Sequence, residues 1–480
     1  MNRRMVLYTI GQIIKVEAIL LTLPAVVSLI YREQCFWSFL LTIGIAICLG
    51  FPMTIISRPS NHVIYAKEGF VIVAAAWIMM SLVGALPFYL SGEIPSYISA
   101  VFETVSGFTT TGASILKDVE ALSRGMLFWR SFTHWVGGMG VLVFVMAVIP
   151  SMSDRSIHIL RAEVPGPIVG KLVPKTKDTA KILYLIYIAM TVLEIILLLC
   201  GGMNLFESAV HAFGTAGTGG FGIKADSIAG YNSYLQWVIT IFMLLFGVNF
   251  NLYYLLIIRR FRSVFKSAEL WCYGAIALIS IGLVTFSIYP MYQNFEQAFR
   301  LSAFQVSSIM TTTGYATANF DLWPGLAKGV LLVLMFIGAC AGSTAGGLKV
   351  SRVILLMKMG RREIHHMLHP RSVSAVKLEG KKIDNATQNS VSSYFTLYSA
   401  CFAIVFLLLC FEPFDLETNL SAAASCFNNV GPGFSAVGPA ASYADYSAFS
   451  KIVLSFAMLL GRLEIFPLII AFSPSTWAKK

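Results

Sequence analysis

The sequence has few charged residues for its length and no long hydrophilic stretch. Only 12% of its 480 residues are Asp, Glu, Lys or Arg, whereas 57% are hydrophobic. A soluble globular domain carries about twice that share of charged residues. The composition therefore excludes an ordinary soluble protein and is typical of a chain that crosses a membrane several times.

Other signatures are also missing. The eight cysteines are scattered, and most lie inside hydrophobic runs rather than at the spacing of a metal site or a disulfide framework. No Ser-His-Asp arrangement, pair of catalytic carboxylates or cofactor loop stands out, so an enzyme is the weakest functional class. The longest hydrophilic segments span about 30 to 40 residues, less than the ~50 of a small domain. We therefore expect any nucleotide-dependent regulation to come from another chain.

Long hydrophobic runs dominate what is present. About ten runs are close to the 20 apolar residues that cross the ~30 Å hydrocarbon layer as a helix. The first run follows Arg3 and Arg4 and is too long for the core of a signal peptide, so we expect it to remain in the protein. The sequence thus predicts an all-α polytopic membrane protein.

The net charge of +11 is unevenly distributed between the connecting segments. Lys and Arg concentrate in alternate connecting segments, whereas the connections between these are poor in Lys and Arg and contain several acidic residues. Because positive charge concentrates on the cytoplasmic side, we expect both chain ends and the basic segments to be cytoplasmic. The charge thus reports topology, and it does not predict nucleic-acid binding. The basic segments are 57–68, 150–181, 259–269, 349–386 and the tail that ends in Lys479 and Lys480.

One unit recurs four times: a full apolar span, a shorter apolar segment, a glycine-containing turn and a second full span. The short segments are about half as long as a crossing requires, so each is expected to enter the membrane and return. They are 97–108 before TTTGA, 204–215 before AGTGGF, 295–310 before TTTGY, and 417–428 before NNVGPG. The predicted units are two N-terminal spans (1–68), then pore repeats 69–179, 180–269, 270–386 and 387–480.

The four turns favour a cation filter around one central pore. Non-helical backbone at membrane depth is tolerated only where it is buried in protein or lines a water-filled cavity. Glycine permits angles that let successive carbonyls point the same way, and rings of oxygens can replace the hydration shell of a cation. A lone TTTG could be a polar kink, but its recurrence at matching points favours the filter. The candidate filter residues are Thr110, Thr111, Gly112, Gly217, Thr218, Gly219, Thr312, Thr313, Gly314, Asn429, Val430 and Gly431, with Gly112, Gly219, Gly314 and Gly431 aligned.

The stretch GACAGSTAGG at 338–347 interrupts the second span of the third repeat. Glycine costs about 1 kcal/mol relative to alanine within a helix, so we expect the helix to break there. Leu348 follows where a phosphate-binding loop needs lysine, which argues against nucleotide binding. Close helix packing through small residues is one interpretation, and a loop that gates the pore is the other. The candidate gating residues here are Gly342, Ser343, Thr344, Ala345, Gly346 and Gly347.

Arg462 lies within an otherwise apolar span. A charge at that depth is costly and should face the bundle interior or a wet cavity. Glu464, two positions away, points elsewhere on a helix, so a partner must come from another segment. A buried structural ion pair and an arginine that contacts the gating loop are both open.

His365 and His369 have the i, i+4 spacing of a helical metal pair in a segment that also contains His366. No third ligand is evident, and the segment is basic. We therefore favour a solvated or partner-facing helix over a metal site.

Taken together, these residues resemble the Trk/Ktr/HKT superfamily of potassium transporters, and the two extra N-terminal spans resemble its TrkH/TrkG type. The resemblance covers essentially the whole chain. It rests on the TTTG turns and on HWVGGMGV at 134–141, RAEVPGP at 161–167, GACAGSTAGGLKVSR at 338–352, NNVGPG, and LLGRLEIFPL at 459–468.

The resemblance implies potassium uptake across a bacterial cytoplasmic (inner) membrane, through a pore gated by the intramembrane loop and Arg462. Gly112 implies a preference for potassium, since serine there accompanies sodium in the family. Potassium is the implied ion, with no organic cofactor bound by this chain. The implied assembly is a homodimer that carries a cytosolic TrkA-like subunit binding NAD, ATP or ADP, docked through segments 150–181 and 349–386.

A secondary transporter that couples potassium to sodium or protons is the alternative. Such carriers usually show inverted repeats and intramembrane carboxylates. This chain shows parallel repeats, and Glu103 and Glu207 are the few candidate acids in the short segments.

Overall fold

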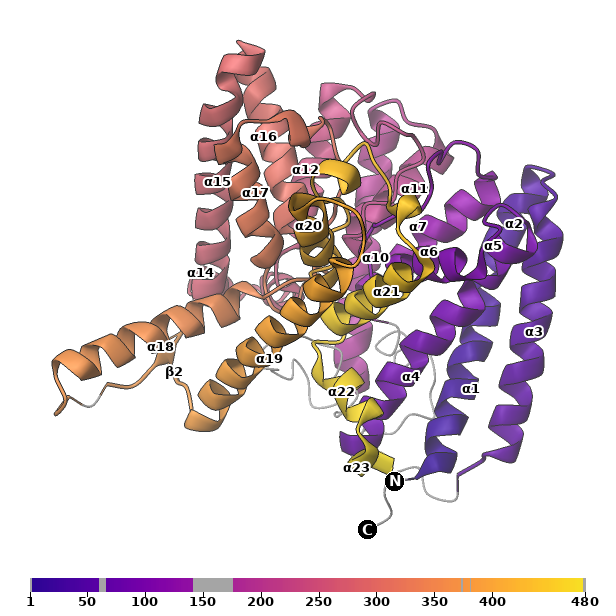
Figure 1. The fold of residues 1–480 in the computed structure, drawn as a ribbon, viewed down its shortest axis with the longest axis horizontal. Helices are drawn as coiled ribbons and strands as arrows, with labels where there is room; N and C mark the ends of the chain where they lie inside the picture. Colours follow the sequence, from indigo (N-terminus) through magenta and orange to yellow (C-terminus); the bar gives the residue numbers. More distant parts are fainter. Residues whose placement is uncertain (1, 60–65, 141–175, 373, 380, 478–480) are drawn as a thin grey trace.

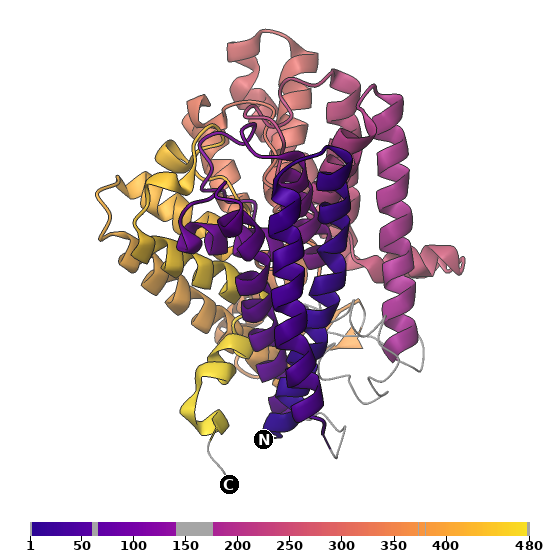
Figure 2. The same cartoon turned by 90° about the vertical axis from the view of Figure 1, so that its right-hand side faces the viewer.

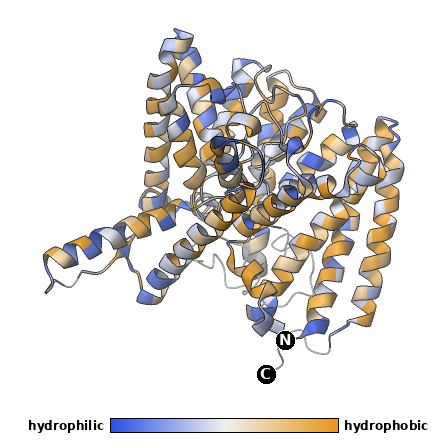
Figure 3. Ribbon diagram, in the orientation of Figure 1, coloured by the Kyte–Doolittle hydropathy of each residue, from blue (hydrophilic) through white to orange (hydrophobic). Residues whose placement is uncertain are grey.

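The computed structural model describes residues 2–59, 66–140, 176–372, 374–379 and 381–477, and this part of the chain is mainly helical. Six of its helices are long and apolar enough to cross a membrane, or up to eight if each of two bent pairs is one span. Hydrophobic residues cover most of their length (Figure 3). Its one sheet is a hairpin of β1 (Lys377–Leu378) and β2 (Lys381–Lys382). The expected all-α polytopic fold is confirmed.

Two long antiparallel helical segments precede the repeats and pack against each other (Figure 2). The first is α1 (Arg3–Leu20) with α2 (Thr22–Ile30), and the second is α3 (Cys35–Ile56). Gly11 and Gly50 face each other where α1 and α3 meet, and a Cβ on either would lie 3.0 Å from the carbonyl oxygen of the other. Small residues thus allow the two backbones to approach closely.

Each repeat begins with a long helix and continues with a shorter pore helix, as the sequence predicts. The pore helices begin at a Ser, Asn or Asp side chain that accepts a hydrogen bond from the first turn, which stabilises the helix start. The long helices are α4 (Ala66–Gly84, extended by α5, Leu86–Leu90), α10 (Thr176–Cys200), α15 (Ala268–Tyr292) and α19 (Asn385–Leu409). The pore helices are α6 (Tyr97–Phe108), α11 (Leu205–Gly217), α16 (Phe295–Met310) and α20 (Leu416–Phe427).

The second spans of the second and fourth repeats depart from expectation, and that of the first repeat lies partly outside the described residues. The helix of the third repeat breaks over the glycine-rich stretch, as predicted, but those of the second and fourth repeats also break, with bends of 91° and 119°. The second spans are α7 (Arg124–Gly138), α12 (Ser233–Phe246) with α13 (Phe250–Ile257), α17 (Gly325–Phe336) with α18 (Val350–Leu368), and α21 (Ala448–Arg462) with α22 (Phe466–Phe472). Short elements are α14 (Phe261–Phe265), η1 (Phe320–Leu322), η2 (Ser435–Val437), η3 (Tyr443–Asp445) and α23 (Pro474–Trp477).

The glycine-rich stretch of the third repeat explains the break in the second. Where α12 stops, the carbonyl of Gly247 accepts a hydrogen bond from the Cys340 N–H, and the Phe250 N–H donates to the Gly342 carbonyl, both at 3.0 Å. The backbone groups freed from the helix are therefore satisfied by the neighbouring repeat. The sequence predicted that the second repeat ends in one full span, residues 234–258, and this prediction was wrong because α12 and α13 are separated by the break.

The four repeats close into a ring, in which α21 of the last repeat lies beside α6 of the first (Figure 1). The helix that follows each pore helix packs against that pore helix and against the pore helix of the next repeat. Thus α7 contacts α6 and α11, α12 contacts α11 and α16, α17 contacts α16 and α20, and α21 contacts α20 and α6. Because the last of these contacts returns to the first repeat, the four pore helices surround one axis.

The contact between Gly11 and Gly50 predicts a position-specific loss of stability. We expect Gly50→Val to destabilise the protein by about 1–3 kcal/mol, because its side chain would overpack the α1–α3 contact. The control is Gly44→Val in the same helix, where an added Cβ meets nothing within 4 Å. Thermal unfolding in detergent, followed by size-exclusion chromatography, compares the two variants. Equal melting temperatures would contradict this packing.

Candidate ion-conducting site

The four turns after the pore helices share one backbone conformation. In each turn a residue with positive φ is followed, after one intervening residue, by a glycine with positive φ. The pairs are Thr110 (55°) with Gly112 (80°), Thr218 (54°) with Gly220 (73°), Thr312 (55°) with Gly314 (84°), and Asn429 (57°) with Gly431 (106°). For a β-branched threonine this conformation is strained, and such strain concentrates at functional sites.

The glycines bring the four turns into direct contact. Each positive-φ glycine lies against the carbonyl oxygen of the residue that precedes the matching glycine in the next repeat. Gly112 lies against Gly219, Gly220 against Thr313, Gly314 against Val430, and Gly431 against Thr111. A Cβ at any of these positions would collide with that oxygen. The turns therefore form a closed ring of backbone, in the order of the repeats.

This geometry corrects the alignment of the second repeat. The sequence aligned Gly219 with Gly112, but Gly220 has the positive φ and the equivalent contact. Gly219 is instead the residue whose carbonyl faces Gly112, and a Cβ on it would strike the ring of His134. Two adjacent glycines follow Thr218, so sequence spacing alone could not assign the position.

The predicted filter residues of the other three repeats lie in the ring. Thr110, Thr111 and Thr312 are completely buried, as are Thr313, Asn429 and Val430. The hydroxyl oxygen of Thr110 has no hydrogen-bond partner in the described part of the chain. Gly217 ends α11 and Thr218 caps it, so both lie at the start of the second turn.

A buried ion pair that the sequence did not reveal supports the ring from behind. Glu103 of α6 accepts hydrogen bonds from the Ser114 hydroxyl at 3.0 Å, the Ile115 N–H at 2.9 Å and Arg130 Nε at 2.6 Å. Arg130 also donates to the Gly222 carbonyl at 2.9 Å. The pair therefore joins the segment after the first turn to the segment after the second. The sequence marked Glu103 as an acid within a short segment, but it did not reveal Arg130 as its partner.

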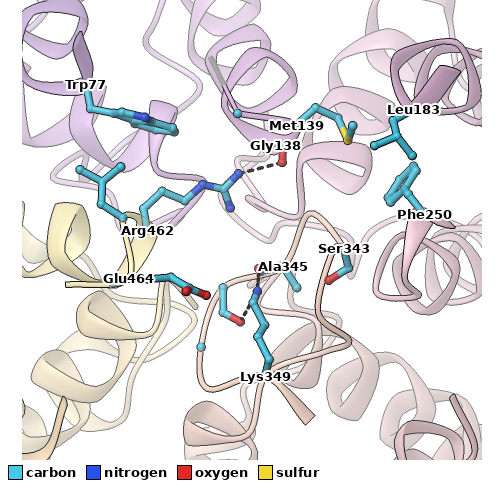
Figure 4. Close-up of a pocket in the computed structure, with 16 residues that line it drawn as sticks. Trp77, Gly138, Met139, Leu183, Phe250, Ser343, Ala345, Lys349, Arg462 and Glu464 are labelled. Carbon is cyan, nitrogen blue, oxygen red and sulfur yellow. Dashed lines mark hydrogen bonds between the residues drawn. The ribbon is translucent and has the colours of Figure 1, made fainter. Parts of the chain in front are cut away.

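The ring separates two cavities. A cavity of about 390 Å³ is lined by the four positive-φ glycines and by the segments that follow them. A smaller one of about 60 Å³ is lined by Trp77, Gly138, the glycine-rich loop and Arg462 (Figure 4). Thr312 contacts this loop, whereas Gly314, two residues further on, faces the larger cavity. The turn of the third repeat thus extends from one cavity to the other.

The loop between α17 and α18 presses on the ring from the side of the smaller cavity. The Gly346 N–H donates to the Thr312 hydroxyl at 2.7 Å, and a Cβ on Gly346 would meet Asn428 and Asn429 of the fourth repeat. The base of the loop is closed by a hydrogen bond from the Gly338 N–H to the Leu348 carbonyl at 2.9 Å. The loop therefore contacts the turns of the third and fourth repeats.

Arg462 connects this loop to the first repeat. Its guanidinium donates to the carbonyls of Thr344 at 2.8 Å, of Gly138 at 2.7 Å and of Gly137 at 2.5 Å. The expectation of a partner from another segment is therefore correct. Glu464 pairs instead with Arg352, through two hydrogen bonds of 2.9 and 2.5 Å.

The remaining candidates lie away from the ring. His365 and His369 have ring centroids 4.9 Å apart near the exposed end of α18. Among the described residues no three His, Cys, Asp or Glu side chains are placed to hold a metal ion. The RAEVPGP motif and almost all of segment 150–181 lie outside the described residues.

Comparisons with known proteins agree on one family. The TrkH family model, described as a cation transport protein, matches residues 38–271 and 277–479. The chain is 34% identical to the Trk system potassium uptake protein TrkH of Halomonas elongata over 100% of both chains. It is also 34% identical to TrkG of Escherichia coli, over 99% of this chain and 98% of that protein. The crystal structure of the potassium transporter TrkH from Vibrio parahaemolyticus covers 100% of both chains with a TM-score of 0.89 and 30% identity.

The corrected position of Gly220 gives a test by substitution. We expect Gly220→Ala to destabilise the protein by at least the ~1–3 kcal/mol of a strained backbone, because its Cβ also collides with the Thr313 carbonyl. Gly222→Ala is the matched control, since a Cβ there meets its nearest atom at 3.6 Å. Thermal unfolding measures both. Equal stability of the two variants would argue against the ring.

Proposed function

The chain belongs to the TrkH family of cation transport proteins, and from this premise we propose that it takes up potassium through a channel-like pore in the bacterial cytoplasmic membrane. The observation that carries the proposal is the closed ring of four turns, in which each glycine faces the carbonyl of the next repeat. Rings of such oxygens are suited to replacing the hydration shell of potassium.

The selectivity filter comprises the predicted residues of all four turns, with Gly220 added by the corrected alignment. The carbonyls that face the glycines belong to Thr111, Gly219, Thr313 and Val430. The unpartnered Thr110 hydroxyl supplies a further oxygen. We infer that a potassium ion passes along this ring between the two cavities, with the larger cavity on the outer side.

The gate comprises residues 342–347 and Arg462. The loop contacts the filter through Thr312, and Arg462 holds the loop carbonyl of Thr344 against α7 of the first repeat. The guanidinium group of Arg462 has several hydrogen-bond donors, which fix the loop, and a positive charge, which opposes the entry of cations. Opening then requires the loop to leave the ring.

The topology and assembly complete the proposal. Both chain ends and the basic segments lie on the cytoplasmic side, which is the side of the loop. Two copies of the chain form a homodimer that carries a cytosolic, TrkA-like subunit binding NAD, ATP or ADP. The relatives are named as parts of a Trk system, which supports a multi-component assembly. Within segment 349–386, α18 carries Lys358, Arg361 and Arg362 and projects from the bundle (Figure 1).

A carrier that couples potassium to sodium or protons is the second candidate. The observation that favours it is two separate, fully buried carboxyl groups, Glu17 in α1 and Glu194 in α10, which have no ion-pair partner among the described residues. Neither lines a cavity at the ring. Glu103 is held in its ion pair with Arg130, which makes it a poor coupling group. Unitary currents in a planar bilayer support the pore, and slow stoichiometric coupling supports the carrier.

Selectivity tests the filter directly. We expect Gly112→Ser to weaken discrimination against sodium, because its side chain would displace the Gly219 carbonyl from the ring. Reversal potentials in mixed potassium and sodium gradients measure the effect. Gly329→Ser in α17 is the control, since an added Cβ there meets nothing within 4 Å. Unchanged reversal potentials for Gly112→Ser would reject the filter.

Flux tests the gate. We expect Arg462→Ala to raise potassium flux per folded molecule, because it removes a positive charge and the hydrogen bonds that hold the loop. Deleting part of 342–347 should also produce a leak, with selectivity retained. Flux is normalised to the amount of folded protein, because a purely structural role of Arg462 predicts a different result. In that case Arg462→Ala would express poorly, at a cost of several kcal/mol, with unchanged flux per molecule.

A further inference from the structure

Lys349 is a second buried cation beside the filter, and neither the sequence motifs nor the gate described above assigns it a role. Its side chain is only 2% exposed. Its ammonium group donates to the carbonyl of Ala345 and, at 3.2 Å, to that of Gly346, as Figure 4 shows. Both carbonyls belong to the glycine-rich loop, so the ammonium group of Lys349 lies against the inside of this loop.

The carboxylates that act on Lys349 are engaged by other groups. Glu464 binds Arg352 with both of its oxygens. Glu269 accepts hydrogen bonds from the Ala341 N–H at 2.8 Å and the Ser351 N–H at 3.1 Å. Among the described residues, no salt bridge reaches Lys349. Because burial without a counter-ion disfavours a charged group, the hydrogen bonds to the carbonyls of Ala345 and Gly346 are what stabilise the ammonium there.

The position of this charge relates it to the permeating ion. Lys349 and Arg462 both line the small cavity on the inner side of the ring. Backbone carbonyls are the ligands with which pores coordinate potassium, and the ammonium of Lys349 binds two of them. Gly346, one of its two partners, also touches the filter through the Thr312 hydroxyl. An ion leaving the filter inward would therefore meet a positive charge that already occupies its ligands.

We propose that Lys349 is a barrier charge of the closed gate: its ammonium takes the place of a potassium ion at the carbonyls of Ala345 and Gly346. This inference rests on the proposed function, because it requires the loop to lie in the cation path. It differs from the role of Arg462, whose hydrogen bonds hold the loop from outside. Lys349 instead opposes cations from within the loop.

The test compares Lys349→Met, Lys349→Gln and Lys349→Arg in the full chain, reconstituted in liposomes. We expect about tenfold higher potassium flux per folded molecule for the Met and Gln variants, since both lose a like charge near the ion path. The Arg variant retains the charge and should stay near the wild type. The matched control is Lys358→Met, because Lys358 lies in α18, the helix that Lys349 immediately precedes, and also donates to a backbone carbonyl, at 2.9 Å, but is exposed.

The Gln variant separates charge from hydrogen bonding. Its amide can still donate to the loop carbonyls, so flux at the wild-type level in Lys349→Gln, with a leak in Lys349→Met, would overturn the barrier role. Unchanged flux in both variants would overturn it as well. If Lys349→Met fails to fold, the Gln and Arg variants still decide. The two proposals can fail separately. If the wild type selects potassium and Gly112→Ser weakens discrimination against sodium, the filter proposal stands whatever the Lys349 variants show. A wild type without potassium flux would reject both proposals.

Discussion

The contact between four glycines and four carbonyls is the constraint on which the rest of the structure depends. No side chain can enter at Gly112, Gly220, Gly314 or Gly431 without displacing the wall of the next repeat. The helices α7, α12, α17 and α21 each pack between two successive pore helices and so fix the spacing of those walls. Because non-helical backbone is tolerated at this depth only beside protein or water, the ring and the breaks around it form one interdependent structure.

Length and glycine content made much of this fold predictable. Short apolar segments predicted the pore helices, and the glycine-rich stretch predicted that α17 would end early. The breaks in the second and fourth repeats have weaker signals, because they depend on hydrogen bonds from the neighbouring repeat and on positive φ at Glu464 and Ile465. The Glu103–Arg130 pair and the setting of Lys349 were missed because their partners or surroundings come from separate elements.

The four turns of the ring share one backbone conformation, but different side chains stabilise them. The ninth residue before the positive-φ glycine is Glu103, His211, Gln305 or Ala422 in the four repeats. Glu103 binds Arg130 and the following segment, whereas Gln305 donates an amide hydrogen bond to the Tyr315 carbonyl at 3.4 Å. Four sequences in one chain can thus reach one turn geometry by separate means, which identical subunits could not do.

In the described part of the chain, the loop that contacts the ring belongs to the third repeat, and its contacts reach the second, third and fourth repeats directly and the first through Arg462. All four repeats contribute a turn to the ring, whereas the loop between α17 and α18 comes from the third repeat. On the proposed function, the turns of all four repeats together select the ion, whereas the loop of one repeat controls its passage. Because the loop residues 342–347 are not part of any of the four turns, a substitution in the loop can change its contacts without changing the sequence of the ring, and the two features can vary separately.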